Sequence, residues 1–530
     1  MGAVKLHSAE IVGLAGEIID VEIDLSSGLF HFSIVGLADK AIEESKERVA
    51  AAIKNSGLRS PQKRNQRVTV SLAPADLKKE GPLFDLAIAL SYLLASKQIE
   101  FDPAKKIFLG ELALDGNLRK IKGALSLALE AKEKGFLEMI LPEENAEEAS
   151  LVSGISIYGA KTLSDVIGHL EGEVLIPKHA GTKIENGQAY PLDFGEIKGQ
   201  EIAKRGLALA AAGSHHVLMV GPPGTGKTML ARAFPSILPQ MDFDEILEVT
   251  KIHSIAGNLK EPYLAERPFR NPHHTASYVA LVGGGQTPHP GEITLAHRGV
   301  LFMDEFPEFE RRVLEALRQP LEDGVVSVSR AKGTISFPAK SLMVFAMNPC
   351  PCGNYGSANK PCLCSIQTLY RYQRKVSGPI ADRIDVWLEV PHFESTKMAQ
   401  KSKVESDGIR KKVEKAREIQ KKRFADRKIR VNSEMRPKEI EEFAPLSNEC
   451  EDLLRDATGK LDLSARAYHR VIKLSRTIAD FESSKDIKKE HLLEALQYRP
   501  RKNFFIYESC LLFQNAHGSR LSFRMNQHNQ

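Results

Sequence analysis

The sequence predicts an α/β multidomain protein built around a core with a parallel sheet. The first observation is a complete GxxxxGK[ST] motif at residues 221–228, which lies between an apolar strand pattern and a helix pattern. The second is the alternation of short strand and helix patterns over residues 1–177, which indicates an α+β domain before the core. The third is helical spacing within residues 396–500, which predicts a C-terminal helical lid.

Length and composition are those of a soluble globular protein with two to four domains. The chain has 530 residues, of which 42% are hydrophobic, and its net charge of +5 is too small to indicate a nucleic-acid partner by itself. No apolar run is long enough to span a membrane, and residues 1–7 lack the apolar core of a signal peptide. We therefore expect a cytoplasmic protein with no membrane partner.

The GxxxxGK[ST] motif predicts a loop that binds the phosphates of ATP. Its glycines let backbone N–H groups curl around phosphate oxygens. Lys227 would reach the β and γ phosphates, and the Thr228 hydroxyl would bind Mg²⁺. The predicted binding residues of this loop are Gly221, Pro222, Pro223, Gly224, Thr225, Gly226, Lys227 and Thr228.

Two later strand patterns end in polar residues that would complete an ATPase site. Residues 299–305 are apolar and end in Asp304 and Glu305, the Walker B pattern. Asp304 would hold Mg²⁺ through water, and Glu305 would polarise the attacking water. Residues 342–348 form a further apolar strand with Asn348 at its tip. Because the carboxyl ends of parallel strands share one sheet edge, we expect these side chains beside the phosphate loop. The alternative for Asp304 and Glu305 is that they are two surface acids at the end of a strand.

The first domain, residues 1–177, begins with two alternating, half-buried strand patterns at residues 21–25 and 30–35. A Ser-Ser-Gly turn separates them, so the pattern predicts a hairpin. A helix pattern over residues 41–56 and a strand pattern at residues 67–72 follow.

This domain, over roughly residues 1–175, resembles the proteolytic domain of Lon proteases, a variant of the ribosomal-S5-like fold. The residues that carry the resemblance are Leu109-Gly110-Glu111-Leu112, Gly116, Ile121-Lys122-Gly123 and Ile140-Leu141-Pro142-Glu143-Glu144-Asn145. The resemblance implies a serine nucleophile after a Gly-Pro pair and a lysine in a later helix, but these positions hold Leu83 and Ser126. Leucine offers no nucleophile and serine offers no activating amine. We therefore expect a Lon-like domain that is not an active protease.

The remaining boundaries follow from changes in composition. A polar, glycine-bearing linker occupies residues 178–192, and the core extends over residues 193–395. Residues 396–500 form the lid, and residues 501–530 form an atypical tail that we expect to be weakly ordered.

The core is similar to AAA+ ATPases, and the resemblance implies roles for four further sites. Asn348 takes the sensor 1 position, where it would orient water toward the γ-phosphate. Residues 197–200 would cap the adenine, or else form a turn and a helix N-cap. Arg383 resembles the arginine finger of the magnesium-chelatase branch, which completes a neighbouring subunit's site and implies a ring; a surface ion pair is the alternative. Arg466 matches sensor 2 and would contact the γ-phosphate of the same or a neighbouring subunit.

An insertion rich in glycine and histidine starts near residue 269, between the phosphate loop and the Walker B strand. Its histidines lack the spacing of metal ligands, and we interpret the insertion as a mobile loop that faces the pore of a ring. The four histidines are His273, His274, His289 and His297.

Four cysteines form two C-x-C pairs: Cys350, Cys352, Cys362 and Cys364. Four thiolates on a short loop with glycine and proline suit a tetrahedral, structural Zn²⁺. The alternative is four reduced cysteines without a metal.

Residues 401–430 are strongly basic, with thirteen Lys or Arg against five Asp or Glu, and form either a solvated helical face or a contact for the DNA backbone.

The order of these features over residues 1–500 resembles the ComM/YifB type of magnesium-chelatase-like ATPase. The resemblance implies a bacterial, cytoplasmic, hexameric DNA motor that hydrolyses ATP with Mg²⁺, has helicase activity, and promotes branch migration and homologous recombination of incoming DNA in natural transformation. It implies DNA, single-stranded or branched, as the partner. A magnesium-chelatase-type motor subunit and a protein-remodelling ATPase are the alternatives.

Overall fold

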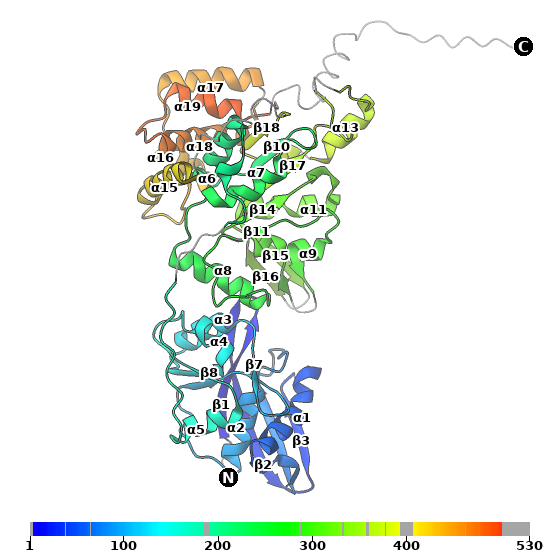
Figure 1. The fold of residues 1–530 in the computed structure, drawn as a ribbon, viewed down its shortest axis with the longest axis vertical. Helices are drawn as coiled ribbons and strands as arrows, with labels where there is room; N and C mark the ends of the chain where they lie inside the picture. The colour runs from blue at the N-terminus through cyan, green and yellow to red at the C-terminus, as the bar shows by residue number, and fades with distance from the viewer. Residues whose placement is uncertain are drawn as a thin grey trace, which may run out of the picture.

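A computed structural model describes residues 4–37, 39–63, 65–184, 190–285, 288–330, 333–356, 360–376, 378–392, 406–461 and 463–500. Three parts follow one another in it: an N-terminal α+β domain, a core with the phosphate loop, and helices packed beside that core (Figure 1). The predicted tail, part of the linker and residues 393–405 lie outside the described residues. Among the described helices, none is both long and apolar enough to cross a membrane.

The first sheet of the N-terminal domain has the order β1 (Val4–Val12), β2 (Ala15–Ser27), β4 (Gln66–Ala73) and β3 (His31–Val35). The predicted hairpin between the second and third strands is therefore wrong, because β4 lies between them. β3 is parallel to β4, and a parallel pair needs a crossover connection, which helix α1 (Lys40–Asn55) supplies.

A second, parallel sheet completes this domain with the order β5 (Lys106–Phe108), β8 (Glu138–Pro142) and β9 (Ser156–Ala160). The apolar helix α2 (Asp85–Ala95) is buried along most of its length, in the core that β1 to β4 also line. The remaining elements are β6 (Glu111–Leu112), β7 (Leu118–Arg119), α3 (Ala124–Glu133), α4 (Glu143–Ala149) and α5 (Leu163–Leu170).

The core sheet is parallel, with the order β11 (Phe269–Arg270), β14 (Val300–Met303), β17 (Leu342–Met347), β10 (Val217–Val220) and β18 (Val386–Glu389). The three central strands are buried along their whole length, as expected for a sheet covered on both faces. β10 comes first in the chain among the strands of this sheet and lies between the last two, β17 and β18, so the strand order reverses beside it. In such sheets, ligands bind at the carboxyl ends of the strands at this position.

Helices and short strands surround the core sheet. They are α6 (Glu201–Gly213), α7 (Lys227–Ala233), α8 (Phe243–Ile255), α9 (Tyr278–Val282), β12 (Gly283–Gly284), β13 (His289–Pro290), α10 (Glu292–Leu295), α11 (Arg311–Ala316), α12 (Arg318–Asp323), β15 (Val325–Arg330), β16 (Gly333–Pro338), α13 (Ile366–Lys375) and α14 (Gly378–Ala381). Helix α8 joins the core to the N-terminal domain. The Ser254 hydroxyl at its end accepts from Gly123 N (2.9 Å) and donates to the buried Glu148 carboxylate (2.5 Å).

The C-terminal region is helical: α15 (Ser406–Arg423), α16 (Pro437–Phe443), α17 (Asn448–Leu461), α18 (Ala465–Phe481) and α19 (Lys489–Gln497). Its apolar side chains share one hydrophobic cluster with α6 and the sheet, so the region packs firmly on the core. The basic segment divides into two kinds of residue. The arginines of α15 are partly buried, as in the Arg423–Asp480 ion pair, whereas the lysines of α15 are exposed.

Candidate active site

The phosphate loop connects β10 to α7 and needs glycine at several places. Gly224 and Gly226 have φ of +75° and +91°, a region that other residues rarely adopt. A Cβ atom on Gly221 would lie 2.1 Å from Val390 O, so only glycine fits this close approach. Gln200, which was predicted to lie near the adenine, donates to Pro391 O at 2.9 Å and makes a longer contact of 3.5 Å to Thr225 O. The structure therefore places Gln200 beside the loop.

Lys227 lies folded into this loop. Its Nζ donates to Gly221 O (2.6 Å), Pro222 O (2.8 Å) and Asn348 Oδ1 (3.2 Å). Burial lowers the pKa of the ammonium group. The contact brings Asn348, at the end of β17, to the residue that would bind the phosphates of ATP.

The two predicted Mg²⁺-binding residues touch each other. The Thr228 hydroxyl donates to Asp304 Oδ2 at 2.7 Å, and Asp304 follows β14 directly. A hydroxyl and a carboxylate from neighbouring elements are oxygen ligands of the kind that Mg²⁺ prefers. The pair fits a Mg²⁺ ion held through Thr228 and, by way of water, Asp304.

Glu305 points into solvent at the same sheet edge. Its side chain is 57% exposed, its backbone has φ of +50°, and its carboxylate lies 3.1 Å from His274 Nδ1. Strained backbone at a non-glycine residue is common at functional sites. His274 comes from the insertion, and sequence reasoning gave it no place at the active site.

The other histidines of the insertion differ in their surroundings. His273 stacks on His274, with ring centroids 4.2 Å apart. His297 is buried, and both ring nitrogens have partners: Nδ1 accepts from Lys340 N, and Nε2 lies 3.1 Å from the Glu248 carboxylate. Within the described residues, the histidines form no cluster with metal-binding geometry.

The two arginines with predicted roles at a subunit boundary meet at one carboxylate. Arg383 pairs with Glu322 and is 5% exposed, and Arg466 Nη2 lies 3.4 Å from the same Glu322 oxygen. The hydrogen bond from Arg383 lowers the pKa of Glu322. In the described part of the chain, neither arginine contacts the phosphate loop. Sequence reasoning missed Glu322, which is an ordinary helical acid in α12.

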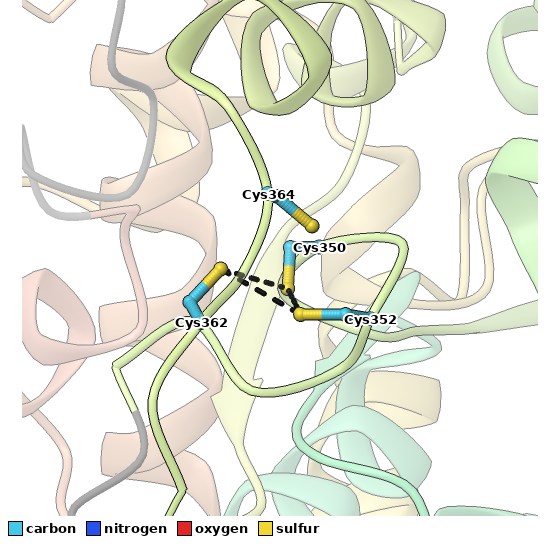
Figure 2. A group of neighbouring side chains, drawn as sticks. All are labelled: Cys350, Cys352, Cys362 and Cys364. Carbon is cyan, nitrogen blue, oxygen red and sulfur yellow. Dashed lines mark hydrogen bonds between the residues drawn. The ribbon is translucent and has the colours of Figure 1, made fainter.

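The four cysteines gather at one point, as Figure 2 shows. Their Sγ atoms all lie within 4.8 Å of one another, and Cys350 lies 3.3 Å from Cys352 and 3.7 Å from Cys362. Sulfur atoms at about 2.3 Å from a tetrahedral Zn²⁺ are about 3.8 Å apart, so the cluster fits this ion. The separations exceed the roughly 2.05 Å of a disulfide, and the cysteines are free.

The cysteine loop touches the phosphate loop. Gly353 has φ of +78°, and a Cβ atom there would lie 2.5 Å from Pro223 Cδ. Cys350 also follows Asn348 by two residues. The loop is thus connected to the nucleotide site at Pro223 and at Asn348.

The positions aligned with Lon-type catalysis are both buried in the N-terminal domain. Leu83 is 9% exposed, and the buried Ser126 hydroxyl has no hydrogen-bond partner in the described structure. Inactivity as a protease remains a prediction.

Three related family models match most of the chain. The family described as "Magnesium chelatase, subunit ChlI" matches residues 193–398, "Subunit ChlI of Mg-chelatase" matches residues 21–145, and "Magnesium chelatase, subunit ChlI C-terminal" matches residues 403–499.

Individual relatives give the same result. The competence protein ComM of Haemophilus influenzae is 44% identical over 508 residues, which is 94% of this chain and 98% of ComM. The uncharacterized protein YifB of Salmonella typhimurium is 40% identical over 97% of this chain and its own full length. Lon protease 2 of Bacillus subtilis is 31% identical over 150 residues, 27% of each chain. With identity of 44% over nearly its whole length, the chain belongs to the ComM/YifB family of magnesium-chelatase-like AAA+ proteins.

Proposed function

We propose that this protein is a hexameric, ATP-driven DNA motor of the bacterial cytoplasm that promotes branch migration during recombination of incoming DNA in natural transformation. The observation that carries the proposal is similarity along 94% of the chain to a protein named for competence, in a chain that also holds a full set of ATPase residues. The ATPase part follows from the family. The DNA, the ring and the branch migration are the proposal.

Hydrolysis depends on residues that meet at the edge of the core sheet. Lys227 would bind the β and γ phosphates of ATP in place of its present carbonyl and Asn348 partners. Glu305 would orient a water molecule and accept its proton as that water attacks the γ-phosphorus. Mg²⁺, held through Thr228 and Asp304, would neutralise charge on the phosphates.

A ring explains where the two arginines lie. Arg383 and Arg466 converge on Glu322 and not on the phosphate loop of their own chain. Contact with the γ-phosphate of a neighbouring subunit would let both arginines stabilise the transition state. This placement favours action of Arg466 in trans.

DNA binding requires exposed positive charge, and α15 supplies it. Its exposed lysines are Lys411, Lys412, Lys415, Lys421 and Lys422. Lysine contacts to phosphates bind DNA without regard to sequence, which suits a motor that moves along it.

We also propose a structural zinc ion at the cysteine cluster, because the sulfur separations fit tetrahedral coordination. Metal analysis of protein purified without chelators should give about one equivalent of zinc per chain. Less than half an equivalent, with no change in folding when it is removed, would contradict the zinc site.

The function is tested with purified protein, ATP and a labelled four-way or three-stranded junction. We expect ATPase activity that DNA stimulates, junction migration, and loss of both in Lys227→Ala. An assembled ring that hydrolyses ATP but does not move the junction would refute the DNA motor.

A magnesium-chelatase-type motor subunit is the second candidate, because the matching families carry that description along the chain. Turnover that depends on porphyrin-metallating partner subunits and not on DNA would favour it. Turnover stimulated by an unfolded protein such as casein would instead favour a protein-remodelling ATPase.

A further inference from the structure

A cavity of about 810 Å³ lies at the edge of the core sheet opposite the phosphate loop. Residues just before the parallel strands line it: His216 before β10, Gly299 before β14 and Asp385 before β18. Residues of the C-terminal helical region, from α15 to α18, form the facing wall. Because the phosphate loop follows the carboxyl end of β10, this cavity is distinct from the ATP site of the same chain.

Cationic side chains dominate the lining. Nine lysine and arginine residues face five aspartate and glutamate residues. Several of the acids are already neutralised, since Asp385 pairs with Arg470, and Glu434 lies 3.2 Å from Lys340 Nζ. The cavity therefore carries an excess of positive charge.

Four of the lining cations have no carboxylate within ion-pair distance in the described structure. They are Arg417, Lys428, Arg436 and Lys473. Arg417 Nε and Nη2 both donate to Ala211 O, at 3.2 and 2.8 Å, which leaves Nη1 without a protein acceptor among the described residues. Lys473 Nζ donates one hydrogen bond, to Ser433 O at 2.9 Å, and keeps two N–H donors.

Burial opposes two of these charges, those of Lys473 and Arg417, whereas Lys428 and Arg436 are exposed. It lowers the pKa of Lys473 to about 8 and that of Arg417 to about 10. Partly buried cations without a counter-charge are costly, and an anion in the cavity would both neutralise them and use their remaining donors. Charge-assisted hydrogen bonds from arginine and lysine to phosphate oxygens are among the strongest available.

The lining also limits the kind of anion. It contains no phenylalanine, tyrosine or tryptophan, so it offers no aromatic platform for a nucleobase. Proteins that hold single-stranded nucleic acid commonly stack its bases on aromatic side chains. The observations thus favour a small ligand made of phosphate groups over a strand of DNA.

We propose that this cavity binds a free polyphosphate anion, which bridges the C-terminal helical region and the amino-terminal edge of the core sheet. Arg417 on α15 and Lys473 on α18 are the central ligands. Such an anion would fasten α15 and α18 to the core.

Isothermal titration calorimetry of the full-length Lys227→Ala variant with tripolyphosphate tests the proposal, because this background removes the main phosphate contact of the ATP site. We expect one binding site per chain. The additional change Lys473→Met should weaken affinity by about tenfold or more, the effect of losing one charge-assisted hydrogen bond. Arg417→Gln should act in the same direction. Lys460→Met, at an exposed lysine on α17 that does not line the cavity, should leave affinity unchanged.

Three results would overturn the proposal. Loss of all binding in Lys227→Ala would locate the anion at the phosphate loop. Equal weakening by Lys460→Met and Lys473→Met would indicate diffuse surface attraction. Stoichiometric displacement of tripolyphosphate by oligothymidylate, lost in Lys473→Met, would identify the ligand as nucleic acid. Thermal unfolding of each variant shows that it is folded, and Lys473→Met decides the outcome if Arg417→Gln does not fold.

Discussion

Substitution of Gly353 by alanine should weaken ATP binding, although the residue lies in the cysteine loop and not in the phosphate loop. At φ of +78°, alanine costs about 1–2 kcal/mol of backbone strain. Its Cβ atom would also lie 2.5 Å from Pro223 Cδ and 2.8 Å from Pro223 Cγ. A proline ring cannot rotate away, so the backbone of the phosphate loop or of the cysteine loop must shift.

The cost of such overpacking is about 1–3 kcal/mol. If this cost destabilises the conformation that binds ATP, the dissociation constant for ATP rises by roughly fivefold to a hundredfold. Gly356→Ala is the matched control: its φ is +75°, but nothing lies within 4 Å of the added Cβ. Both variants should lose similar stability from strain, whereas only Gly353→Ala should bind a fluorescent ATP analogue more weakly. Equal affinities in the two variants would refute the coupling between the loops.

Three further predictions concern the active site, the metal and pH. Glu305→Gln should bind ATP normally but lower kcat by about a hundredfold or more, measured as phosphate release, because the proton acceptor is lost. Removal of zinc by a strong chelator should lower the thermal unfolding midpoint and the affinity for ATP together, and re-addition of zinc should restore both. Burial raises the pKa of Glu10 from 4.5 to about 7, so the folded state keeps this proton while the unfolded state loses it. Unfolding free energy should therefore fall as pH rises from about 4.5 to 7, and Glu10→Gln should be more stable than wild type by about 3 kcal/mol at pH 8 but not at pH 4, in urea unfolding curves.

Residues of the active site that follow a strand could be predicted from sequence because each lies in one short segment together with its apolar strand pattern. Lys227, Asp304 and Asn348 each follow an apolar strand, and parallel pairing brings the three strand ends together. The structure shows the resulting contacts, Lys227 with Asn348 and Thr228 with Asp304.

Features that depend on distant pairing could not be predicted in this way. β4 lies between β2 and β3 because helix α1, after β3, brings the chain back to pair β4 with both strands. The short turn between β2 and β3 therefore gave a misleading local signal of a hairpin. His274 reaches Glu305 from an insertion in another part of the chain, and no spacing rule connects the two residues.

Glu322 shows how contacts that the sequence did not predict change the interpretation of residues that it did identify. From sequence, Arg383 and Arg466 were separate candidates, one with a role in the next subunit and the other with an open choice between subunits. Their shared carboxylate places the two guanidinium groups next to each other in the same chain, with Arg466 exposed and Arg383 nearly buried. A γ-phosphate delivered by a neighbour would compete with Glu322 for both arginines at once. Assembly and hydrolysis would then be linked through exchange of one anionic partner for another, because two guanidinium groups held by one carboxylate keep donors free for a second anion.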